Sequence, residues 1–162
     1  MVSRLSKILH STFISRPGAT VQGLLYYLTS QTAPQLNQYG IVALWVGTNN
    51  LHAPWAETRE AFIQLFLHVK ATAPTTQIAV VSIIPRPRDF GSSRTWITTA
   101  NAWLRLACRR NGFHFFAANH LFVRQGRGLV IHDLYSDGLH LNAAGAKKMR
   151  DFLKTKIRGL FP

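Results

Sequence analysis

Apolar residues lie along the chain in two kinds of pattern, continuous runs and runs with helical spacing. The continuous runs at residues 40–46 and 77–84 predict strands that are buried on both faces, as in a parallel sheet. Shorter apolar runs at residues 12–15 and 113–117 predict two further strands. We expect Trp45, which lies on the strand at residues 40–46, to be part of the core.

Between these runs, apolar residues recur every three or four positions, which is typical of helices with one buried face. Thr20 and Asn142 are suited to cap the N-termini of two helices, and Gly112 is suited to end a third. The predicted helices are residues 2–9, 20–30, 56–72, 93–111 and 142–158. Because strands and helices alternate throughout residues 1–162, we predict one α/β domain, a parallel sheet with helices on both faces.

The chain is strongly basic. The sequence has 19 Lys and Arg against 6 Asp and Glu, a formal net charge of +13. A surplus of this size favours contact with polyanions such as nucleic acid or anionic lipid, although solvated helix faces explain many surface charges. Eight arginines lie between residues 85 and 132, and the last predicted helix carries Lys147, Lys148, Arg150, Lys154, Lys156 and Arg158.

The rest of the composition indicates the class of protein and where in the cell it is expected. Hydrophobic residues make up 47% of the chain and charged residues 15%, which indicates a globular protein. The sequence contains no apolar run of about 18 residues, so we expect no transmembrane segment, and its start does not have the pattern of a signal peptide. The single cysteine, Cys108, has no disulfide partner, so we expect an intracellular protein in which Cys108 is a packing residue rather than a nucleophile.

Polar motifs follow three of the predicted strands. Gly18 comes after the first, Gly47-Thr48-Asn49-Asn50 comes after the second, and Asp137 and His140 come after the last. Because the carboxyl ends of parallel strands meet at one edge of a sheet, we expect these motifs to converge there. Asp137 can orient the imidazole of His140 and leave its other ring nitrogen as a general base. The alternative is that Asp137 only caps backbone amides in a turn that enters a helix.

These motifs resemble those of the SGNH (GDSL-type) hydrolases, a family of esterases and acylhydrolases. Pro17-Gly18-Ala19 resembles the family's second block, whose glycine amide faces the oxyanion hole. Gly47-Thr48-Asn49-Asn50 resembles the third block, with Asn49 at the position that contributes a side-chain amide and Asn50 where the family usually has Asp. Asp137-Gly138-Leu139-His140 resembles the fifth block, which completes the triad. The resemblance covers the whole chain and implies a three-layer α/β/α, flavodoxin-like fold.

The family's first block, Gly-Asp-Ser, has no counterpart in the sequence. That block ends the family's first strand and supplies the nucleophile, so the resemblance implies a chain that begins just after this serine and lacks that strand. We then expect residues 12–15 either to leave a gap beside residues 40–46 or to pair with them directly. Ser3 is the alternative nucleophile, although it falls on the helix predicted at residues 2–9.

The resemblance implies hydrolysis of an ester by Ser-His-Asp chemistry, with Gly18 and Asn49 stabilising the oxyanion. Trp55, in the loop after Asn49, is expected near the substrate. No cofactor is implied, and no His, Cys or carboxylate cluster has the spacing of a metal site. Two rival interpretations are an inactive module of the same fold that binds nucleic acid or anionic lipid through its arginines, and a fragment without activity. The charge and the short stretch before Gly18 are also similar to those of SGNH domains in retroelement-encoded proteins.

Overall fold

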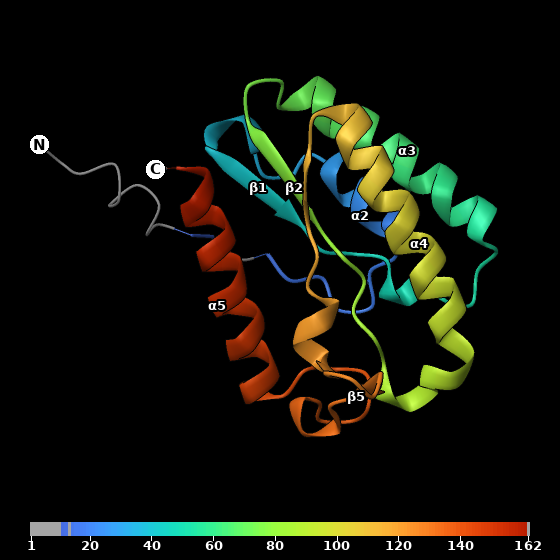
Figure 1. Cartoon of the computed structure of the whole chain (residues 1–162). Helices are drawn as coiled ribbons and strands as arrows, with labels where there is room; N and C mark the ends of the chain where they lie inside the picture. The colour runs from blue at the N-terminus through green and yellow to red at the C-terminus, as the bar shows by residue number, and fades with distance from the viewer. Residues whose placement is uncertain (1–10, 13, 162) are drawn as a thin grey trace, which may run out of the picture.

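The computed structural model describes residues 11, 12 and 14–161 of the chain, and its centre is a parallel sheet (Figure 1). The strands of this sheet are β1 (Ile41–Leu44), β2 (Gln77–Val81) and β3 (His114–Phe116). They are hydrogen-bonded in the order β1-β2-β3, with Val42 opposite Ile78 and Val80 opposite Phe115. The two strongest strands of the sequence pattern are therefore neighbours in the sheet.

Helices cover both faces of the sheet, with α5 on one side and the other α-helices on the opposite side (Figure 1). Side chains of β2 alternate between the two faces, so that Val80 packs in the cluster under α3 and α4 whereas Val81 packs in the cluster under α5. This arrangement confirms an α/β fold with three layers. The α-helices are α2 (Val21–Leu28), α3 (Trp55–Thr72), α4 (Phe90–Asn111) and α5 (Ala143–Leu160).

Local signals in the sequence set several helix ends. The Thr20 hydroxyl accepts from the Gly23 N–H, and the Asn142 side chain accepts from the Gly145 N–H, so both residues are the N-caps that were predicted. Gly112 ends α4 in the left-handed conformation, with a φ of 69°. Helix α4 begins at Phe90, earlier than predicted. No helix of the described residues is long and apolar enough to cross a membrane.

Two predictions about strands are wrong. Thr12, Ile14 and Ser15 are exposed and belong to no strand, and among the described residues β1 pairs only with β2. A segment this short has no regular structure of its own unless a neighbouring strand accepts its hydrogen bonds. The second error concerns Trp45, which is 45% exposed rather than part of the core, because the described sheet ends at β1. The helix predicted at residues 2–9 lies outside the described residues.

The segment after β3 is more ordered than the predicted loop. It contains an antiparallel hairpin in which Val123 pairs with Val130 and Arg124 pairs with Leu129. The strands of this hairpin are β4 (Val123–Arg124) and β5 (Leu129–Val130). Short 3-10 helices connect the main elements, namely η1 (Leu36–Gln38), η2 (Thr48–Asn50), η3 (Pro87–Asp89), η4 (Asn119–Phe122) and η5 (His132–Leu134).

Candidate active site

The first part of the candidate site is the turn after β1, Gly47 to Asn50. Gly47 has a φ of 123°, and a Cβ at this position would lie 2.8 Å from Ile83 Cδ1. Only glycine therefore fits without a shift of the core. The turn continues into η2, which leaves the side chain of Asn49 exposed and that of Asn50 buried. Two consecutive asparagines thus have opposite environments.

Asn50 connects this turn to the start of α2. Its Oδ1 accepts from the Val21 N–H at 2.9 Å, and its Nδ2 donates to Gln22 Oε1 at 2.8 Å. The Val21 amide is one of the donors that a helix N-terminus leaves without an intrahelical partner. Aspartate, usual at this position in the resembled family, could accept from Val21 but could not donate to Gln22. Asn at position 50, where the resembled family usually has Asp, is the one feature of the sequence that indicates this anchor, the pair of hydrogen bonds from Asn50 to Val21 and Gln22.

The anchor at Asn50 brings the Gly18 turn beside Asn49. Gly18 has a φ of 75° in a turn closed by the Ala19 N–H donating to Arg16 O at 3.0 Å. The Asn49 Nδ2 donates to Ala19 O at 3.1 Å, which uses one of its two N–H bonds and leaves the second for another acceptor. Gly18 is exposed, and its N–H donates no hydrogen bond to the described part of the chain. The two predicted oxyanion donors therefore lie close together.

The second part of the candidate site is the Asp137–His140 turn. Asp137 Oδ2 lies 2.6 Å from His140 Nδ1, and Oδ1 accepts from the N–H groups of Leu139 at 2.9 Å and His140 at 2.7 Å. The hydrogen bond with the His140 side chain, followed by those with the two amides, holds the pKa of Asp137 well below its ordinary value. Asp137 thus caps two amides and also contacts the imidazole, so it is more than the simple cap of the alternative interpretation.

This geometry defines what His140 can do. Because Nδ1 faces a carboxylate, the ring presents Nε2 to solvent, and the His140 side chain is 67% exposed. A neutral imidazole held in this way can accept a proton at Nε2, which is the task of a general base. The catalytic role of the pair stays a prediction, whereas its geometry is in place.

The loop between β2 and α4 connects the two parts of the site. From this loop, Arg86 Nη1 donates to Thr48 O at 3.0 Å, and the Arg88 N–H donates to Gly138 O at 3.0 Å. The hydroxyl of the buried Tyr135 also donates to Pro85 O. Sequence reasoning missed this connection because its partners lie far apart in the chain.

The remaining predicted residues have different positions. Trp55 is the first residue of α3 rather than part of a loop, and its ring contacts those of Trp96 and Trp103 edge-on, each at 5.7 Å between centroids. Its role near a substrate stays a prediction. Cys108 is buried, and this burial raises the pKa of its thiol to about 12, which fits a packing residue. Ser3 lies outside the described residues.

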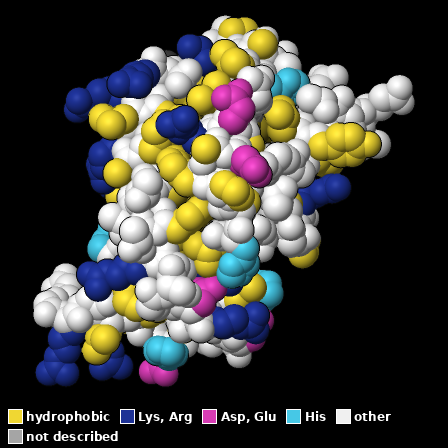
Figure 2. Space-filling view, turned by 90° about the vertical axis from the view of Figure 1, so that its right-hand side faces the viewer, with side chains coloured by type: hydrophobic (Ala, Val, Ile, Leu, Met, Phe, Trp, Pro, Cys, Tyr) yellow, Lys and Arg dark blue, Asp and Glu magenta, His cyan; other side chains and the backbone are white. Residues whose placement is uncertain are grey.

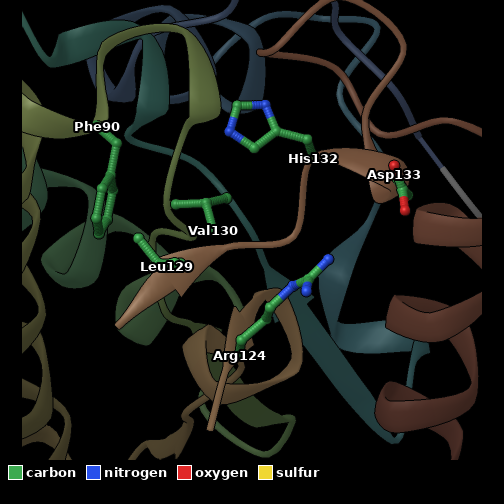
Figure 3. Close-up of a pocket in the computed structure, with 6 residues that line it drawn as sticks. All are labelled: Phe90, Arg124, Leu129, Val130, His132 and Asp133. Atoms are coloured by element: carbon green, nitrogen blue, oxygen red, sulfur yellow. The ribbon is translucent and has the colours of Figure 1, made fainter. Parts of the chain in front are cut away.

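A pocket of about 290 Å³ lies at the hairpin, close in sequence to the Asp137–His140 turn. Figure 3 shows Phe90 and Leu129 side by side at its apolar end, with Arg124 and His132 on other sides. Its lining therefore combines apolar surface with basic and acidic side chains. The lining residues are Phe90, Arg124, Leu129, Val130, His132 and Asp133.

Comparisons with known proteins identify the family of this chain. The pattern of the GDSL-like Lipase/Acylhydrolase family matches residues 1–148. Platelet-activating factor acetylhydrolase IB subunit alpha1 of Rattus norvegicus is 29% identical over 141 residues, which are 85% of this chain and 59% of that protein. The chain therefore spans less than two thirds of the length of this curated relative.

Solved structures share the fold. A GDSL-like lipase from Bacteroides thetaiotaomicron has a TM-score of 0.72 at 17% identity, and the match covers 89% of this chain and 73% of that one. The esterase domain of the ORF1 protein from the zebrafish ZfL2-1 retrotransposon is 28% identical with a TM-score of 0.53, covering 88% of this chain and 85% of that one. Because the family pattern extends over most of the chain and the family's fold is present, the chain belongs to the GDSL-like lipase/acylhydrolase family.

Proposed function

We propose that this protein is an ester hydrolase in which His140 is the general base, Asp137 orients it, and Gly18 and Asn49 stabilise the oxyanion. The observation that carries the proposal is the 2.6 Å contact between Asp137 Oδ2 and His140 Nδ1. A contact of this kind fixes the imidazole tautomer and stabilises the imidazolium that forms during acyl transfer. Because the Asn49 side chain donates to the carbonyl of Ala19, the residue after Gly18, its amide and the Gly18 N–H belong to neighbouring segments and can serve as the two donors that a developing oxyanion requires.

In this mechanism a serine hydroxyl attacks the carbonyl carbon of the ester while His140 Nε2 accepts its proton. The tetrahedral oxyanion receives hydrogen bonds from Gly18 and Asn49, and collapse expels the alcohol, which takes the proton back from His140. Water then repeats the sequence on the acyl-enzyme and releases the acid. We infer that the serine comes from outside residues 14–161, either as Ser3 or as a residue of a longer chain.

A serine-directed probe tests this proposal whatever the natural substrate is. The protein expressed from its natural gene is incubated with a fluorophosphonate, and mass spectrometry locates the labelled residue. We expect one labelled serine, and we expect His140→Ala to abolish labelling because the hydroxyl then has no base. His52→Ala is the matched control, because His52 is an exposed histidine that has no role in the proposed mechanism. Absence of labelling in the wild-type protein would refute the proposal.

The 162-residue chain alone gives a second test, hydrolysis of a short-chain nitrophenyl ester. If the nucleophile is not Ser3, this chain should be almost inactive, because removing a nucleophile costs several powers of ten in rate. Substantial turnover that disappears in both Ser3→Ala and His140→Ala would instead assign the nucleophile to Ser3.

A second candidate function is binding of a polyanion, and α5 carries the observation that favours it. Arg150, Lys154 and Arg158 are exposed at helical spacing along α5, and Lys147 beside them is paired with Asp151 at 2.7 Å. The opposite side of the molecule differs, since Figure 2 shows hydrophobic side chains between separate groups of Lys and Arg. A continuous cationic helix face is suited to contact successive phosphates.

Binding through this face predicts a specific salt dependence. Three exposed cations in contact with single-stranded nucleic acid give a slope of about −2 when the logarithm of the association constant is plotted against the logarithm of the salt concentration. Lys154→Glu should lower affinity and flatten this slope, whereas Lys70→Glu on α3 should change neither by as much. An affinity that is insensitive to salt, or equal effects of the two variants, would exclude α5 as the contact face.

A further inference from the structure

The loop after β2 contains an ion pair that is largely removed from solvent. Arg86 Nη2 lies 2.8 Å from Asp89 Oδ2, and the side chains are 8% and 17% exposed. Arginine is rarely buried to this extent unless its guanidinium is held by specific partners. The pair follows β2 directly, at the carboxyl edge of the sheet where the candidate site lies.

Stability alone does not explain this pair. Arg86 Nε and Asp89 Oδ1 are both buried, and neither has a hydrogen-bond partner among the described residues. A buried ion pair recovers its desolvation cost only when its remaining donors and acceptors are also satisfied. Buried groups that are left incomplete call for another explanation, and a role at a functional site is one of them.

The guanidinium of Arg86 acts on the first part of the site. Its Nη1 donates to the carbonyl oxygen of Thr48 at 3.0 Å. That carbonyl belongs to the peptide unit between Thr48 and Asn49, which is planar and rigid. Holding the carbonyl therefore sets the orientation of the peptide from which the Asn49 side chain projects.

The same loop also holds the second part of the site. The Arg88 N–H donates to Gly138 O at 3.0 Å, within the turn that carries Asp137 and His140. Two residues of one short loop thus contact both turns, Arg86 through its side chain and Arg88 through its backbone. The side chain of Arg88 is exposed and takes no part in this connection.

We propose that Arg86 is a positioning residue for the oxyanion site: through the Thr48 carbonyl it holds the Asn49 amide in a fixed position relative to the Asp137–His140 pair. Asp89 completes the arrangement by orienting the guanidinium. The proposal rests on the ester hydrolase function proposed above. In this proposal Arg86 acts through Thr48, since its side-chain hydrogen bonds within the described residues go to Thr48 O and Asp89.

The main test measures backbone order at the Gly47–Asn50 turn by NMR relaxation on the 162-residue chain. The variant is Arg86→Met combined with Asp89→Leu, because removal of one partner alone leaves a buried unpaired charge. We expect the order parameters of Thr48 and Asn49 to fall from about 0.85 toward about 0.6, the range of flexible backbone. Arg88→Ala is the matched control and should leave them unchanged. Unchanged order in the double variant would overturn the proposal, whether or not the protein hydrolyses esters.

A kinetic test then asks whether Arg86 acts through Asn49. In the protein form that the fluorophosphonate labels, Arg86→Met/Asp89→Leu should lower kcat by about tenfold to a hundredfold, because small misplacements of catalytic groups have effects of this size. KM should change by less than about twofold if substrate binding is retained. In an Asn49→Ala background the same change should add almost nothing. If the losses in kcat caused by Arg86→Met/Asp89→Leu and by Asn49→Ala are additive, Arg86 does not act through Asn49. An inactive wild-type protein would refute the proposed function, and the positioning role of Arg86 would then be decided by the relaxation measurement.

Discussion

Gly138→Ala is the sharpest test of how the His140 turn is held in place. Gly138 has a φ of 81°, and a Cβ there would lie 3.2 Å from both the backbone nitrogen and the Cβ of Arg88. The neighbour cannot retreat easily, because the same Arg88 nitrogen donates to Gly138 O. Alanine would therefore meet two penalties, a left-handed backbone and a crowded contact.

Gly126 offers a matched control, since its φ of 77° is nearly the same and a Cβ there would meet nothing within 4 Å. A left-handed alanine costs about 1–2 kcal/mol, and the reduced entropy of the unfolded chain offsets about 0.4–1 kcal/mol of this. Gly126→Ala should thus lower the free energy of unfolding by about 1 kcal/mol. Crowding adds about 1–3 kcal/mol at Gly138, so Gly138→Ala should lower it by about 2–4 kcal/mol.

Urea unfolding of the wild-type protein and both variants measures these differences, and amide exchange at Arg88 reports whether its hydrogen bond to Gly138 survives. We expect the larger loss of stability and faster exchange at Arg88 in Gly138→Ala alone. Equal losses in the two variants, with the Arg88 amide equally protected, would show that the close approach of the two segments does not exist in solution.

Three further predictions concern single side chains. Asn50→Ala should lower the free energy of unfolding by about 1–3 kcal/mol, because the buried Val21 N–H loses its partner. Asn49→Ala should lower it by less, about 0.5–1 kcal/mol, because the hydrogen bond that it removes, to Ala19 O, is exposed to solvent. Equal urea midpoints for the two variants would contradict this. Folding lowers the pKa of Asp137, so the contribution of this carboxylate to stability is present above the ordinary carboxyl pKa of about 4 and is lost as the pH falls. The difference in Tm between the wild-type protein and Asp137→Asn should therefore shrink in acid. A difference that stays constant with pH would contradict this. Trp45→Lys should change Tm little, since the Trp45 side chain is 45% exposed; a loss of Tm as large as that of Asn50→Ala would contradict this.

The parts of the fold and site that the sequence predicted depend on residues close together in the chain. Thr20 and Asn142 cap helices within three residues, and the spacing of Asp137 and His140 alone places the carboxylate on the imidazole. Such contacts follow from local geometry, because the intervening backbone has few conformations. The alternation of strands and helices is local in the same sense, and it was sufficient to predict the layers.

The contacts that assemble the site join residues that lie far apart in the sequence. Asn50 reaches Val21 across 29 positions, and Arg86 reaches Thr48 across 38. No periodicity or spacing rule connects such partners, since their distance depends on how whole elements pack. The hairpin at β4 and β5 was missed for another reason, because strands of two residues are too short to show an alternating pattern.

The error at β1 shows what an apolar run does and does not determine. Residues 41–46 are all apolar, as in a strand that is covered on both faces, yet Ala43 is exposed and Trp45 is 45% exposed. The apolar residues of a strand indicate that it is suited to burial, whereas its position in the sheet decides how much of it is buried. In the described sheet β1 has a partner on one edge only, β2. The neighbours of a strand come from distant parts of the chain, so the apolar run by itself could not predict them.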